Sequence, residues 1–195
     1  VAQAPLSLIG TAIGQVYLSR APSEHRNSNL GPFTVEILGG LLKAGVGPLL
    51  AAGILAPVLA GPVFGAPWER AGWLVAWMTP WFLLQFLSVP IALALHVTGR
   101  LGAALGLQMA GLVLRVGMVW ATAQWWDVAW LSEAYSVSGA LFYLAYLWVI
   151  LGAVAAHPLK VWAAMKASIR VIAAWVAGAS LLAFGAGHLI ASVGA

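Results

Sequence analysis

Arg115 is the residue whose position most needs a chemical explanation. It lies about fourteen residues into an apolar stretch that runs from 101 to 123, near the middle of a membrane if that stretch crosses one. An arginine at the bilayer midplane costs roughly 2.5–3.5 kcal/mol on insertion scales, and such residues usually face a bundle interior or a water-filled cavity. Arg115 is therefore a candidate contact for an anionic substrate such as a phosphate or pyrophosphate. The alternative is a structural pair with a carboxylate or with helix C-terminal carbonyl groups.

Four other polar side chains inside apolar stretches are candidates for substrate binding. Gln108 lies seven residues before Arg115, two turns away on the same helix face, so this face is a candidate cavity lining. Lys43 either lines the inner mouth of a cavity or extends to lipid headgroups. Gln15 and Gln85 complete the set, and the alternative for Gln85 is a hydrogen bond between helices.

The sequence carries no pattern for metal, nucleotide or covalent chemistry. It has no cysteine, its four histidines show no metal-ligand spacing, and it has no paired carboxylates, nucleophile elbow or phosphate loop. We therefore predict no enzyme, no metal and no cofactor. The net charge of +4 does not favour nucleic acid, because the basic residues flank apolar stretches and form no basic stripe.

Composition and periodicity predict an all-α integral membrane protein, a bundle of about six transmembrane helices. Hydrophobic residues make up 63% of the 195 residues and charged residues 7%, whereas a soluble domain carries roughly 25% charged residues. The apolar segments do not alternate as barrel strands would. The predicted helices are 3–19, 37–63, 72–97, 101–123, 136–156 and 161–191. We expect a polar loop from Arg20 to Pro32, and the start of the last helix, Lys160 to Arg170, along the membrane interface.

The basic residues predict an orientation. Seven of the nine Lys and Arg residues lie at or near alternate connections, Arg70 lies in the opposite set, and Arg115 lies inside a segment. Basic residues near short loops stay on the cytoplasmic side, so the first segment is expected to run inward. Tryptophans support this orientation, because indole rings anchor at headgroup level and six of them fall at the expected outer ends: Trp68, Trp73, Trp120, Trp125, Trp126 and Trp130.

Four short pieces occur in a fixed order between Gly14 and Gln124. They are Gly14-Gln15-Val16-Tyr17 before a polar loop; Val63-Phe64-Gly65 followed by Trp68-Glu69-Arg70-Ala71-Gly72; Pro80 with Leu84-Gln85-Phe86 and Ser88-Val89-Pro90; and Gly99-Arg100 followed by Gln108 and Arg115. In order and spacing this stretch resembles the later half of a bacterial oligosaccharide flippase, of the polysaccharide-transporter family in the multidrug/oligosaccharidyl-lipid/polysaccharide superfamily. After Trp125 the likeness is one of hydropathy and topology.

The resemblance implies a fold, a function and a substrate. The chain begins with Val1 inside an apolar segment and would be a fragment, most of the C-terminal lobe of a two-lobed transporter whose N-terminal lobe is missing. Its activity would be export of an oligosaccharide, carried on an undecaprenyl-type pyrophosphate lipid, across the bacterial inner membrane for surface polysaccharides such as lipopolysaccharide. Transport would proceed by alternating access through a cationic cavity between the lobes, where Arg115 and Lys43 would hold the pyrophosphate.

Three alternatives stay open. A multidrug exporter of the same superfamily would favour acidic residues in the middle of the membrane. A membrane-embedded polysaccharide ligase or polymerase would need a large outer loop with catalytic groups. A scaffold without transport would hold Arg115 fully paired in a dry core.

Overall fold

The computed structural model describes the backbone of residues 3–193 and the side chains of residues 10–188. The described part consists of helices joined by short connections and contains no strand, which confirms the predicted all-α class. In chain order the elements are α1 (Gln3–Arg26), α2 (Leu30–Leu41), η1 (Leu42–Val46), α3 (Gly47–Phe64), η2 (Ala66–Trp68), α4 (Glu69–Ser88), η3 (Val89–Ile91), α5 (Ala94–Val97), α6 (Leu101–Trp125), η4 (Val128–Trp130), α7 (Leu131–Ala153) and α8 (Pro158–Val193).

Five helical stretches in the described residues are long and apolar enough to cross a membrane. They are Leu30–Phe64, Ala66–Val97, Leu101–Trp125, Val128–Ala153 and Pro158–His188. These stretches are compatible with a multi-pass membrane protein. The helix α1, which contains the first predicted segment, is not among them, and its last turns carry the charged residues Arg20, Glu24 and Arg26.

One predicted boundary is corrected by the structure. The stretch from Arg20 to Pro32 is mostly helix, and only residues 27–29 separate α1 from α2. Glu24 stabilises this short connection because its carboxylate accepts hydrogen bonds from both Arg20 and Asn29. The last predicted helix, 161–191, lies within α8, a continuous helix of 36 residues.

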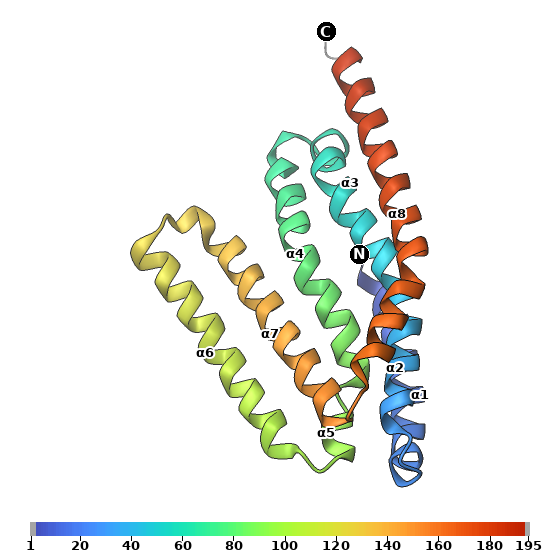
Figure 1. Cartoon of the computed structure of the whole chain (residues 1–195). Helices are drawn as coiled ribbons and strands as arrows, with labels where there is room; N and C mark the ends of the chain where they lie inside the picture. Colours follow the sequence, from blue (N-terminus) through green and yellow to red (C-terminus); the bar gives the residue numbers. More distant parts are fainter. Residues whose placement is uncertain (1–2, 194–195) are drawn as a thin grey trace.

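The five long stretches stand side by side in a single row. Their lateral order is α8, α3, α4, α7 and α6, as Figure 1 shows, and each helix packs on its neighbours in this order. The helix α1 lies outside the row and packs against α2, η3 and α5. The row is thin because α6 and α8, at its two edges, each have a neighbour on one side only.

The row is closely packed at one end and open at the other. The connections 27–29, 98–100 and 154–157 meet at what we name the basic end, and the connections 65–68 and 126–127 lie at the opposite end, named the tryptophan end (Figure 1). A buried cluster joins four parts of the chain at the basic end: Tyr17, Ala21, Leu30, Phe33, Ile91, Ala94, Leu95, Tyr146, Ile150 and Val154. Towards the tryptophan end the helices fan apart.

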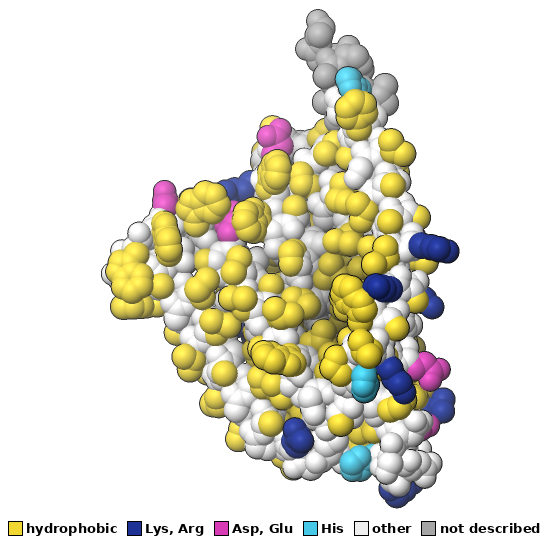
Figure 2. All heavy atoms as spheres, in the orientation of Figure 1, with side chains coloured by type: hydrophobic (Ala, Val, Ile, Leu, Met, Phe, Trp, Pro, Cys, Tyr) yellow, Lys and Arg dark blue, Asp and Glu magenta, His cyan; other side chains and the backbone are white. Residues whose placement is uncertain are grey.

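Apolar side chains cover the helices on their outer faces as well as in the core. Figure 2 shows hydrophobic groups over the visible face of every helix in the row. The edge helix α6 exposes Leu105, Leu112, Val113 and Val116, each by more than half of its surface. In lipid such a surface is stable, because hydrocarbon tails solvate apolar side chains.

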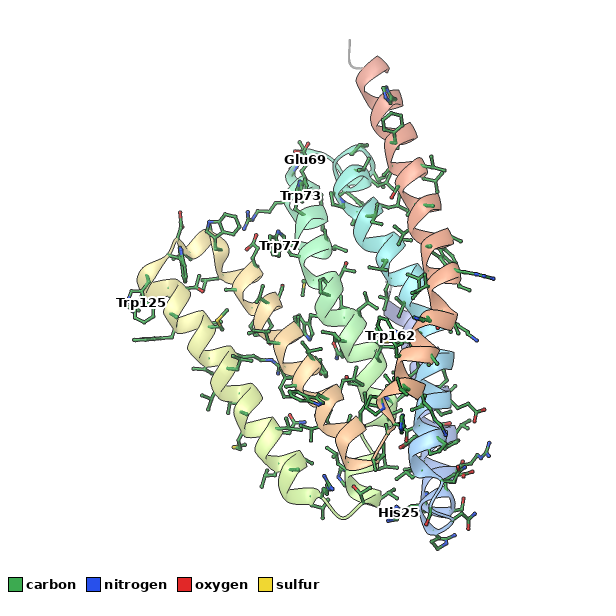
Figure 3. All side chains as sticks on the ribbon, in the orientation of Figure 1. His25, Glu69, Trp73, Trp77, Trp125 and Trp162 are labelled. Carbon is green, nitrogen blue, oxygen red and sulfur yellow. The ribbon has the colours of Figure 1, made fainter. Side chains whose placement is uncertain are left out.

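The six tryptophans predicted at the outer ends are all exposed. Trp73 and Trp125 lie near the tryptophan end with Glu69, as labelled in Figure 3. Trp126 is 71% exposed, and the other five are each exposed by at least half. They point away from the helices instead of filling gaps between them, which is the arrangement of side chains that anchor at headgroup level.

Candidate functional site

The Arg115 side chain lies between three helices of the row. It projects from α6, and its guanidinium carbon is 4.9 Å from the centre of the Phe142 ring on α7 and 5.9 Å from that of Trp81 on α4. A cation over an aromatic face gains about 0.5–2 kcal/mol, depending on how far it is desolvated. The two rings therefore stabilise the guanidinium charge of Arg115.

Two glycines allow the aromatic rings to take these positions. A Cβ atom at Gly139 would lie 2.6 Å from the Trp81 ring, and one at Gly111 would lie 2.5 Å from the Phe142 ring. Only a residue without a side chain lets the ring of the neighbouring helix approach so closely. Tyr135, one turn before Gly139 on α7, also contacts Trp81 edge-on, with ring centres 5.3 Å apart.

The site has hydrogen-bond donors without acceptors. Arg115 Nε and Trp81 Nε1 are both buried, and neither has a hydrogen-bond partner among the described residues. The ion pairs of the described chain are Arg20–Glu24 and Arg70–Glu133, so Arg115 has no carboxylate partner there. Unpaired buried donors are costly, and a cationic donor costs most. An oxygen-bearing anion is the type of acceptor that a guanidinium binds through charge-assisted hydrogen bonds.

A hollow lies beside this site, one turn nearer to the tryptophan end. It has a volume of about 310 Å³ and is lined by Leu74, Met78, Val119, Leu131, Ser132 and Tyr135. Tyr135 both lines the hollow and contacts Trp81. Neither Arg115 nor Trp81 lines the hollow, so Tyr135 is the residue that connects it with the unpaired donors.

An ion pair links α4 and α7 at the tryptophan end. Arg70, at the start of α4, lies 3.2 Å from the Glu133 carboxylate in the first turn of α7, and it also donates to the carbonyl oxygen of Ala129. Glu133 is buried, and its second carboxylate oxygen has no hydrogen-bond partner among the described residues. This pair joins the two connections of the tryptophan end. Because Glu133 is the carboxylate of α7 and pairs with Arg70, α7 offers no other carboxylate to Arg115.

The structure separates the other predicted residues into different places. Gln108 is on α6 with Arg115 but is exposed, two turns nearer to the basic end. Lys43 is exposed in η1, and α3, α4 and α7 lie between it and α6. Lys43 and Arg115 therefore do not form one cationic site within this chain.

Gln15 and Gln85 are brought together in a groove. The groove runs between α1 and α4, has a volume of about 670 Å³, and is lined by residues from α1, α3, α4, η3 and α5. Gln15 is exposed and Gln85 is half-buried. These two amides line a second candidate site, separate from Arg115.

Sequence reasoning missed the aromatic partners of Arg115. Trp81 lies inside its segment, unlike the six terminal tryptophans, but so do Trp148 and Trp175, so the sequence did not single it out. Phe142 and Gly139 carried no distinguishing pattern. The pair between Arg70 and Glu133 was also missed, since the two residues are 63 positions apart and only the packing of α4 on α7 brings them together.

Comparisons of the chain with protein-family models, curated proteins and solved structures find no match. Nothing in them identifies a flippase family, so the resemblance noted above stays a prediction.

Proposed function

We propose that the protein exports a lipid-linked oligosaccharide across the bacterial inner membrane, with Arg115 as a contact for the phosphate or pyrophosphate of the lipid carrier. The observation that carries the proposal is the unpaired state of Arg115. A cation held near mid-membrane by two aromatic rings, beside a second unpaired donor and a hollow, matches an anionic oxygen group. The oligosaccharide itself rests on the sequence resemblance.

The physical problem in such export is to move a charged, hydrated group through hydrocarbon. Leaving water without compensating bonds costs a phosphate many kcal/mol, and fixed donors inside the protein replace part of its hydration. Arg115 lies about 21 Å along α6 from Leu101, at 1.5 Å per residue. That depth is where hydration is hardest to replace.

The proposed orientation places the basic end in the cytoplasm. Arg20, Arg26, Arg100 and Lys160 lie at or near the connections of this end. The lipid carrier would then be taken from the inner leaflet, and Arg115 would meet its phosphate before it reaches the tryptophan end.

A multidrug exporter is the second candidate and is less favoured. A cationic drug would need an acidic partner, and none of the chain's five acidic residues lines the groove or the hollow. A ligase or polymerase is less favoured as well, because the connections 65–68 and 126–130 are short and partly helical.

Gene deletion tests the proposal directly. We expect loss of surface polysaccharide together with accumulation of full-size lipid-linked precursor on the inner leaflet. Unchanged polysaccharide with greater drug sensitivity would favour the multidrug exporter. A shortened or unligated glycan on the outer side would favour the enzyme.

Substitution of Arg115 tests its role in the site. Arg115→Ala is expected to abolish export at normal membrane abundance, because it removes the charge that replaces phosphate hydration. Val116→Ala is the matched control, since Val116 is the next residue on α6 and is 60% exposed. Wild-type export by the Arg115→Ala protein would refute the role of Arg115.

A further inference from the structure

The groove between α1 and α4 is lined by both apolar and polar side chains. Its walls are mainly apolar, with Leu18, Phe82, Phe86 and Leu93 among the lining residues. Besides Thr11, three longer polar side chains line it among the described residues: Gln15 on α1, Gln85 on α4 and His96 on α5. A purely apolar wall would suffice to hold a lipid chain.

The polar side chains lie at three levels along the groove. A Cβ atom at Gly10 would lie 3.8 Å from Phe86, and one at Gly14 would lie 3.7 Å from Pro90, so α1 and α4 run in parallel in this register. In this register Gln15 is level with residue 91. Gln85 is thus six residues farther from the basic end than Gln15, or about 9 Å at 1.5 Å per residue.

His96 marks the end of the groove near the basic end. It follows η3 and the turn at residues 92–93, so it lies on a separate short helix beyond the end of α4. Gln85 and Gln15 alone cover about 9 Å along the groove, close to a third of a hydrocarbon core of about 30 Å.

None of these three side chains has a hydrogen-bond partner among the described residues. An amide that faces hydrocarbon without a partner is unfavourable, so a ligand that carries oxygen atoms would be stabilised there. An amide offers two N–H donors and one carbonyl acceptor. Hydroxyl groups match both halves of an amide because they donate and accept.

The groove also lacks fixed charge. Among the described residues that line it there is no Lys, Arg, Asp or Glu, and His96 is the one titratable side chain. A phosphate at the level of Gln85 would carry its charge into hydrocarbon without a cation beside it. The lining therefore favours an uncharged polar head over an anionic one, in contrast to the Arg115 site.

We propose that this groove binds a membrane lipid with an uncharged, hydroxyl-bearing head, such as a glycosyl diacylglycerol. The head hydrogen-bonds Gln15 and Gln85, and its acyl chains lie on the apolar walls and in the surrounding bilayer. His96 lies where such a head enters from the interface. The groove volume of about 670 Å³ is in the range of sites that hold one small ligand, about 300–1,000 Å³. This inference does not depend on the proposed export function.

Photolabelling with two matched lipids tests the proposal. The full protein is reconstituted in vesicles with a glucosyl diacylglycerol or a phosphatidylglycerol, each with the same photoreactive acyl chain, and labelled peptides are identified by mass spectrometry. We expect groove peptides that contain Phe82, Phe86 and Leu93 to be labelled preferentially by the glucosyl lipid. A net hydrogen bond of ordinary strength corresponds to about a fivefold change in binding, so Gln15→Leu and Gln85→Leu should each lower this labelling about fivefold.

The control variant is Gln124→Leu, which makes the same change at an exposed glutamine of α6 outside the groove. It should label like the wild type. Equal labelling of the groove by the two lipids, or labelling that is insensitive to Gln15 and Gln85, would overturn the proposal. Labelling of the α6 surface without labelling of the groove would also overturn it, because the groove would then be covered by protein.

Discussion

Replacing Gly139 by alanine tests whether the close approach of Trp81 to α7 holds the Arg115 site together. The added Cβ atom would lie 2.6 Å from the Trp81 ring, and the three nearest atoms all belong to that ring. Inserting a methyl group into a packed region costs typically about 1–3 kcal/mol. Alanine in a helix interior regains about 0.5–1 kcal/mol relative to glycine. The midpoints of these ranges leave a net loss of about 1 kcal/mol in the free energy of unfolding.

The matched variant is Gly117→Ala on α6. A Cβ atom at Gly117 would have nothing within 4 Å, so this variant should gain stability where Gly139→Ala loses it. The two should differ by about 2 kcal/mol, measured as thermal unfolding of the purified protein in one detergent. Trp81→Leu should relieve the clash, so a double-mutant cycle with Gly139→Ala should show a favourable interaction energy. Equal stability of the two alanine variants, or strict additivity in the cycle, would refute the close packing of Trp81 on Gly139.

Two further predictions concern the tryptophan end and the orientation. Arg70→Gln should destabilise the protein by about 1 kcal/mol, because it leaves the buried Glu133 carboxylate without its exposed cationic partner, and Glu133→Gln should restore most of this loss. Thermal unfolding of both single variants and of the double variant measures these changes in stability. An Arg70→Gln variant as stable as the wild type would show that the ion pair is not stabilising. Reporter fusions at Asn29 and Lys160 should report the cytoplasm and a fusion at Asp127 the periplasm, and the reverse pattern would overturn the proposed orientation.

The helical class of this protein was predictable because lipid leaves a chain few alternatives. Long apolar runs without alternation indicate helices, since each backbone group must be bonded within its own segment. The error at residues 20–32 has a clear cause. Pro22 and Pro32 suggested a loop, but Pro32 is in the first turn of α2, where no backbone N–H is needed, and Glu24 bonds hold the turn together.

The site was only partly predictable because it depends on lateral packing. The cost of burying a charge identified Arg115 from the sequence alone. Nothing in the sequence specified that α7 lies between α4 and α6, so the contacts with Trp81 and Phe142 could not be derived. The same gap explains why Lys43 was expected near Arg115. Both are intramembrane cations in sequence, but the row places them on opposite sides of α4.

The order of the helices in the row has a consequence for synthesis of the chain. The helix α3 packs on α4, which follows it at once, and on α8, which is made much later. A Cβ atom at Gly47 would lie 2.3 Å from the Trp175 ring, and 128 residues separate these two positions. At roughly 5–20 residues per second, α3 waits about 6–26 s for this partner after it leaves the ribosome. During that interval the side of α3 that α8 later covers is in contact with lipid or with the insertion machinery.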